Sequence, residues 1–439
     1  MFADSISVVW SRGFTLFVVL LLVQGAESLA SQQPESSPSL PHPLPLSWCI
    51  ERASSANPSL QAVDAEAEAA RESAGAAGRL ADPRFGYEML NLPTGDWNLH
   101  STPMSGHQLS LIQKLPVPGL LSSQRAAAQA AARAADAGLD DRRARLAASV
   151  ERAWSALAVA QRALEITERN LDLLRQLRAI AEAKYRVGTG LQQDVLRAQL
   201  ELTTLLAERL RREATLAKRE ASLAALLDLP IAQRFPRTED LSQQTAIPEL
   251  SELLARVGDA SPLLREQRAR IEEAEKRVRA TKLASYPDVD LSVSYRIREQ
   301  VTTDPVHGQD FLSAGFTLRL PVDRQKWNSK VAEQGAFLRK ATASYRASLA
   351  TLGEEIRAAH SDLVEADAEV ELLVTGLLPQ ARQSFESSRS GYEVARIDFL
   401  SLLDSELRLF DAELQLIQAR ATRRESFARL EATMGEELR

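Results

Sequence analysis

The chain contains one structural plan written twice, and this duplication is the strongest constraint on its fold. Four short motifs recur in the same order, each 204 to 207 residues after its first occurrence. The pairs are Asn57-Pro58 with Ser261-Pro262, Asp82-Pro83 with Tyr286-Pro287, Leu115-Pro116-Val117 with Leu320-Pro321-Val322, and Tyr185-Arg186-Val187 with Tyr392-Glu393-Val394. Because such regular spacing is hard to obtain by chance, the sequence predicts two equivalent structural repeats, residues 47–245 and 246–439.

Each repeat contains two stretches in which apolar and polar residues alternate. In the second repeat, Val289, Leu291 and Val293 alternate with Asp290 and Ser292. The alternation predicts strands at about 83–90, 107–115, 287–297 and 311–320, joined in pairs by polar loops. Half-buried hairpins of a soluble protein have this pattern, and so do the strands of about ten residues in a membrane barrel.

Apolar residues with heptad spacing follow the strands in both repeats. Leu400, Leu403, Leu407, Phe410 and Leu414 keep a strict 3-4 spacing, which is typical of a coiled-coil seam. The long helices predicted from such spacing cover about 121–185, 191–227, 325–389 and 399–430. By themselves, these helices are equally compatible with a soluble coiled-coil scaffold.

The N-terminus indicates export. Arg12 precedes the apolar run Phe14–Val23, and the small residues Ser28-Leu29-Ala30 follow. This order predicts a secretory signal peptide over residues 1–30, although a buried core helix has a similar apolar run. The Pro/Ser-rich residues 31–46 are predicted to form a flexible arm. Since no later stretch approaches the roughly 20 apolar residues of a membrane-spanning helix, membrane insertion would have to use strands.

The composition argues against nucleic-acid binding, metal binding and catalysis. The 53 basic and 59 acidic residues are thoroughly mixed and give a net charge of −6, which disfavours a nucleic-acid-binding surface. One cysteine and five histidines without a shared spacing do not make a metal site. The sequence has no glycine-rich phosphate loop, zinc-protease motif or nucleophile elbow. We therefore expect no enzyme activity, no cofactor and no bound metal.

Four strands per chain cannot close into a membrane barrel. The small barrels have at least about eight strands, and an open sheet edge cannot face lipid because its N–H and C=O groups would lack partners. Three copies would supply twelve strands and six antiparallel helical hairpins. A trimeric conduit is therefore the expected assembly, with prolines such as Pro116 and Pro321 between strand and helix.

The duplicated plan and one motif resemble a known family. The motif Tyr185-Arg186-Val187-Gly188-Thr189-Gly190-Leu191-Gln192-Gln193-Asp194-Val195-Leu196 is similar to that of the TolC-type outer membrane efflux proteins. The resemblance covers about residues 46–438. It implies a mainly α protein with a β-barrel part, a homotrimer whose twelve-stranded barrel lies in the outer membrane and whose long α-helical barrel extends into the periplasm.

The resemblance also implies partners. Family members contact outer membrane lipid and dock onto a periplasmic adaptor protein and an inner-membrane pump. The chain looks closer to the partners of heavy-metal and resistance-nodulation-division pumps than to protein-secretion ducts, and the substrate stays open among metal ions, drugs and exported proteins. The expected function is the duct of a tripartite efflux system. The alternative is an exported coiled-coil structural protein without a pore.

The resemblance places a constriction at the periplasmic turns between the long helices. Asp404 occupies a constriction-aspartate position in the second repeat, and Ser401 stands where a second aspartate is common. Tyr392 and Asp194 match a pair that links neighbouring hairpins. Arg197, one helical turn beyond Asp194, is placed to pair with Asp194 or with Asp404. A three-fold ring of Asp404 carboxylates would attract cations, whereas ordinary helix-surface charge is the plain alternative.

The turn itself is the adaptor-contacting tip that the resemblance implies. This first tip consists of Val187, Gly188, Thr189 and Gly190. The second tip, which follows Tyr392, has no glycine at the position equivalent to Gly188. Adaptor contacts are therefore expected mainly at the first tip.

Overall fold

The computed structural model describes residues 40–438, apart from residues 96, 100, 242–245, 299, 302, 303, 305, 306, 395 and 437. The predicted signal peptide and most of the predicted arm lie outside the described residues. All helices and strands below belong to the unit His42–Arg439.

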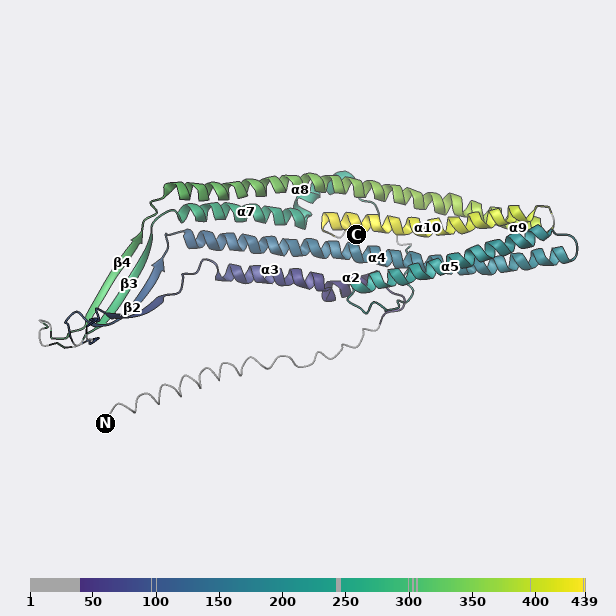
Figure 1. Cartoon of the computed structure of the whole chain (residues 1–439). Helices are drawn as coiled ribbons and strands as arrows, with labels where there is room; N and C mark the ends of the chain where they lie inside the picture. The colour runs from purple at the N-terminus through teal and green to yellow at the C-terminus, as the bar shows by residue number, and fades with distance from the viewer. Residues whose placement is uncertain are drawn as a thin grey trace, which may run out of the picture. The chain divides into compact units, whose positions relative to one another are not determined.

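The order of helices and strands repeats along the chain (Figure 1). The first series is α2 (Leu46–Ala56), α3 (Pro58–Ala76), β1 (Arg84–Leu90), β2 (Gly106–Leu115), α4 (Leu120–Arg186) and α5 (Gln192–Leu226). The second series is α6 (Leu250–Ala260), α7 (Pro262–Leu283), β3 (Asp288–Ile297), β4 (Phe311–Arg319), α8 (Arg324–Leu372), the π-helical turn η1 (Leu373–Leu377), α9 (Leu378–Glu393) and α10 (Phe399–Met434). Each element of the first series has a counterpart in the second, so the predicted duplication is confirmed.

The beginning of α3 shows how one of the repeated motifs sets a helix boundary. Pro58 is the first helical residue, a position where the missing N–H is not needed. The Oδ1 atom of Asn57 accepts hydrogen bonds from the backbone N–H groups of Ser59 (3.0 Å) and Leu60 (3.2 Å). Its Nδ2 atom donates to the carbonyl of Leu226 (3.0 Å). Asn57 therefore caps α3 and also ties it to the end of α5.

The four strands form one antiparallel sheet in the order β1-β2-β3-β4. The central pair, β2 and β3, comes from different repeats, so the sheet joins the two halves of the chain. The edge strands are β1 and β4. Within the described protomer, each pairs on one side only.

The register separates an apolar face of the sheet from a polar face. One row across the strands is Phe85, Leu111, Val293 and Ala314, and the adjacent row on the opposite face is Gly86, Ser110, Ser294 and Ser313. The apolar row belongs to a face that no other element of the described chain covers: Phe85 is 71% exposed and Phe316 is 73% exposed. Such an apolar surface is much larger than the isolated exposed apolar residues of a soluble monomer.

Helix α4 is the central helix of the unit, in contact with α2, α3, α5, α7 and α10 (Figure 1). Its 67 residues contain no proline and a single glycine, Gly138, so it runs uninterrupted for roughly 100 Å at 1.5 Å per residue. Many of its buried residues are alanines, among them Ala130, Ala134 and Ala137, which allow neighbouring helices to approach closely. Within the described residues, no helix combines the length and the apolarity needed to cross a membrane.

The second repeat differs from the first in the continuity of its long helix. The sequence predicts one helix over 325–389, whereas the structure has α8, the π-helical turn η1 and α9. Pro379 explains the difference, because it lacks an N–H and its ring would clash with the carbonyl of Thr375 in a regular α-helix. The wider π turn accommodates the proline without ending the helix. As a result, α9 still reaches the second tip.

Candidate functional site

The first tip is a tight turn closed by backbone hydrogen bonds. The N–H groups of Thr189 and Gly190 both donate to the carbonyl of Lys184, at 2.9 and 3.0 Å. Gly188 has a φ of +77°, in the left-handed region that favours glycine. A Cβ atom on Gly190 would lie 2.9 Å from the Cβ of Lys184. Both glycines are therefore required by the turn, which presents the 73% exposed Val187 outward.

The second tip is built differently. The N–H of Arg396 donates to the carbonyl of Gly391 (2.8 Å), and the Asp398 carboxylate caps α10 by accepting from the N–H of Ser401 (2.7 Å). This cap lowers the pKa of Asp398, through its bonds to Ser401. Ala395, which stands where the first repeat has Gly188, lies outside the described residues. The two tips are therefore not interchangeable surfaces.

Lys184 and Tyr392 hold the two tips together. The Lys184 Nζ atom lies 4.0 Å from the centre of the Tyr392 ring and also donates to the Tyr392 backbone carbonyl. The ring packs edge-on against Phe399, with 5.5 Å between ring centres. Sequence reasoning missed Lys184, because its partner is 208 residues away in the chain.

The predicted pair Tyr392 and Asp194 is brought close but is not hydrogen-bonded within the protomer. Tyr392 is buried, and its hydroxyl has no hydrogen-bond partner among the described residues. Burial raises the pKa of Tyr392, and the nearby negative charge of Asp194 raises it further. The link between neighbouring hairpins that the resemblance implies stays a prediction.

Asp404 pairs with Arg408 rather than with Arg197. The Arg408 Nε atom lies 2.8 Å from the Asp404 carboxylate, and the two side chains are 73% and 60% exposed. Arg197 forms no ion pair with Asp194 or Asp404 in the described part of the chain. An exposed pair four residues apart on a helix contributes little to stability. The Asp404 side chain is therefore exposed to solvent, and the positive charge of Arg408 partly offsets its negative charge.

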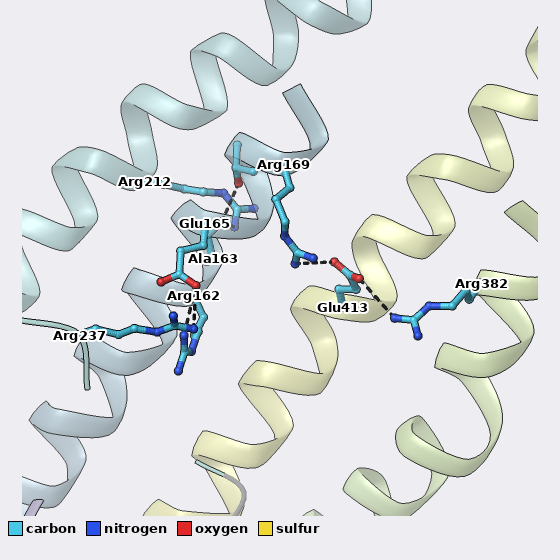
Figure 2. A network of polar contacts seen from close by, with 9 residues as sticks. Arg162, Ala163, Glu165, Arg169, Arg212, Arg237, Arg382 and Glu413 are labelled. Carbon is cyan, nitrogen blue, oxygen red and sulfur yellow. Dashed lines mark hydrogen bonds and ion pairs between the residues drawn. The ribbon is translucent and has the colours of Figure 1, made fainter. Parts of the chain in front are cut away.

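A network of arginines and glutamates connects the helices further from the tips (Figure 2). Glu413 of α10 lies 3.1 Å from Arg169 of α4 and 3.9 Å from Arg382 of α9. Glu165 of α4 binds Arg162 (3.2 Å) and Arg237 (3.3 Å), the latter in the segment between α5 and α6. Each of these pairs has a partially exposed member, so the network contributes little to the free energy of unfolding. Its main effect is to fix how the helices lie against one another.

No group of three or more His, Cys, Asp or Glu side chains that could hold a metal ion occurs among the described residues. The tips combine backbone turns closed by hydrogen bonds, the exposed acids Asp398 and Asp404, and a cation–aromatic contact between two hairpins.

Comparisons with known proteins agree with this architecture. A model of the family described as outer membrane efflux protein matches residues 49–228 and 253–436. The cobalt-zinc-cadmium resistance protein CzcC of Cupriavidus metallidurans is 24% identical over 307 residues, which cover 70% of this chain and 71% of CzcC. The structure of the outer-membrane channel OprN has a TM-score of 0.74 at 21% identity, with 89% of this chain and 90% of OprN covered. The CmeC outer membrane channel of Campylobacter jejuni has a TM-score of 0.75 at 13% identity, with 92% and 90% covered.

The two structural likenesses show a shared fold, and the family match falls once on each repeat. The resemblance to TolC-type proteins is thereby confirmed. These relatives are named as channels or as a resistance protein, and none of the three as an enzyme. The chain therefore belongs to the outer membrane efflux protein family and is a protein of the outer membrane.

Proposed function

We propose that three copies of the chain form the outer membrane duct of a tripartite efflux system. The observation that carries this proposal is the sheet, which has one exposed apolar face and two edge strands that pair on one side only within the described residues. In lipid, unpaired backbone groups are costly, so such edges must pair with other copies. Three copies of the four-stranded sheet give a closed barrel of twelve strands.

The helical part supports a periplasmic tube that ends at the tips. Two helical hairpins per chain, α4 with α5 and α9 with α10, would give six hairpins in the trimer. The rigid, exposed first tip, from Val187 to Gly190, is the proposed docking site for a periplasmic adaptor protein. The adaptor would connect the duct to an inner-membrane pump of the resistance-nodulation-division type.

The proposed entrance of the duct lies beside these tips. There, Asp404 would contribute one carboxylate from each copy to a ring, while Tyr392, Asp194 and Arg197 would form contacts between hairpins. The exposure of Asp404 and the pKa of Tyr392, raised by burial and by Asp194, support this arrangement. A ring of three like charges at a narrow point favours cations over anions.

Heavy metal ions are the substrate class that we propose to test first. CzcC, the relative described above, is named for resistance to cobalt, zinc and cadmium. The experiment is co-expression of this chain with a periplasmic adaptor and a pump of the resistance-nodulation-division type, in a host that lacks its own duct. Growth in Co²⁺, Zn²⁺ or Cd²⁺ should then depend on the chain. Growth only in drugs, or secretion of a protein, would assign the other substrate classes.

Assembly is tested on the protein extracted from outer membranes. Mass photometry in mild detergent should show trimers, and heating before electrophoresis should convert a trimer band to a monomer band. Purified trimers should conduct in planar bilayers. A stable folded monomer that does not conduct would favour the alternative, an exported coiled-coil protein without a pore.

A further inference from the structure

The contact between the two helical hairpins contains a buried carboxyl group that has no cationic partner among the described residues. Glu406 of α10 is 1% exposed, and neither of its side-chain oxygens has a hydrogen-bond partner in the described part of the chain. Asn170 of α4 is 7% exposed, and its Nδ2 atom also lacks one. Since buried polar groups are nearly always hydrogen-bonded, this pair is unusual. The adjoining buried cluster is apolar and includes Leu171, Leu174, Leu402 and Leu403.

The charged groups around Glu406 are acidic. The charges of Glu201 on α5 and Asp411 on α10 raise the pKa of Glu406, and the neutral Asn170 on α4 lowers it. Arg169 of α4 and Arg382 of α9 bind Glu413 instead, two helical turns further along α10 (Figure 2). From α9, Phe385 and Tyr392 join the adjoining apolar cluster. An ionised Glu406 would therefore be a buried charge without a counter-ion, which is strongly unfavourable.

The protonation state of Glu406 follows from these surroundings. Burial raises its pKa from the ordinary 4.5 to about 8; the Asn170 amide opposes the shift, and the two acids add to it. The line of contact between α4 and α10 around Glu406 is called the seam below. While this seam is closed, the carboxyl is therefore neutral at neutral pH. With the seam open, water would reach the carboxyl and return its pKa toward 4.5.

The direction of the pH effect is fixed by this difference. Glu406 binds its proton more tightly when the seam is closed than when it is open. The proton therefore stabilises the closed seam fully below about pH 4.5. This stabilisation of the closed seam decreases as the pH rises from about 4.5 to about 8, and it does not decrease further above pH 8. Alkaline conditions should therefore separate α4 from α10 at this level.

We propose that Glu406 is a protonation-dependent latch between the α4–α5 hairpin and the α9–α10 hairpin. The neutral carboxyl keeps the seam between α4 and α10 closed, and loss of its proton opens the seam. The latch lies in the hairpin contact that ends at the two tips, where Lys184 already joins them through Tyr392. Its effect on passage rests on the proposed duct function, whereas its effect on the seam does not.

Hydrogen exchange of the purified trimer, corrected for the intrinsic effect of pH on exchange, tests the seam directly. Residues 165–181 and 399–414 of the wild type should lose protection as the pH rises toward about 8, by up to about tenfold per pH unit for one linked proton. Helix α7 (262–283) should keep its protection and is the internal reference. Glu406→Gln, which is neutral at every pH and nearly the same shape, should remove the pH dependence.

The matched control is Glu386→Gln, an exposed glutamate of α9 that should retain the wild-type pH dependence. The latch is refuted if the wild-type seam exchanges at the same corrected rate at all pH values, or if Glu406→Gln keeps the wild-type response. The wild-type measurement decides even if Glu406→Gln does not assemble. Conductance recorded in parallel separates the two proposals: a conducting trimer with a pH-independent seam refutes the latch alone, and a non-conducting protein with a pH-dependent seam refutes the duct alone.

Discussion

At the scale of single residues, the charge of Asp404 at the proposed entrance depends on one neighbouring residue. Asp404 shares its charge with Arg408, four residues along the same face of α10. The sequence places Asp404 near the second tip, but the resemblance gives no role to Arg408. A carboxylate that carries its own cation attracts other cations less strongly than a free one.

The two substitutions at this pair should have opposite effects on ion selectivity. Asp404→Ala removes a negative charge from each copy and leaves Arg408 unpaired, so it should reduce cation selectivity and weaken block by multivalent cations. Arg408→Ala leaves the carboxylates unbalanced and should increase both. Reversal potentials of purified trimers in a salt gradient measure the selectivity. If neither variant changes it, Asp404 is an ordinary charge on a solvated helix.

At the scale of elements, the register of the sheet assigns each strand residue to a face. Leu291 pairs with Gln113 and Phe316 on the mainly apolar side, whereas Ser292 pairs with Ile112 and Gly315 on the other. The alternation in the sequence predicts these two faces without the structure. What it leaves open is whether the apolar face meets lipid or a protein core.

Leu291→Arg and Ser292→Arg separate these cases. If the apolar face meets lipid, an arginine at position 291 costs about 2–4 kcal/mol near the bilayer centre and should reduce the amount of trimer in the outer membrane. An arginine at position 292 would face the lumen, so the trimer should still insert and its conductance should change. Outer membrane fractions, resolved with and without heating, report insertion. Similar losses for both variants would contradict the assignment of the faces.

The sequence predicts most elements because strand alternation and heptad spacing are local signals. It misses η1, because the sequence predicts one regular helix through Pro379, and the widened turn that accommodates the proline has no local pattern of its own. It also misses the burial of Glu406. Helix α10 packs against α4, α8 and α9. More of its surface is therefore buried than the single apolar stripe formed by Leu403, Leu407 and Phe410. Contacts between the repeats, such as Lys184 with Tyr392, leave no local pattern.

At the scale of the whole molecule, the open edges determine how copies must join. Strands β1 and β4 run antiparallel to each other, since each step across the four-stranded sheet reverses direction. In a closed barrel, β4 of one copy therefore meets β1 of the next as an antiparallel pair. Residues opposite each other in such a pair have Cα atoms about 4.5–5.5 Å apart, which is within the range that a disulfide spans.

Cysteine pairs across this junction should link three copies. We expect Glu88→Cys on β1, combined in turn with Phe311→Cys, Ser313→Cys, Thr317→Cys or Arg319→Cys on β4, to give a covalent trimer in at least one combination, seen by electrophoresis without reductant. All five positions lie on the more polar face of the sheet. The native Cys49 should not compete, because burial raises its pKa to about 12 and keeps it protonated.

In the control, Gln108→Cys on β2 is used in place of Glu88→Cys. Both sides of β2 are already paired, to β1 and to β3, so the control should give no linked trimer. Cross-linking in the control alone, or in none of the β1–β4 pairs, would show that the copies do not close into a barrel through these edges.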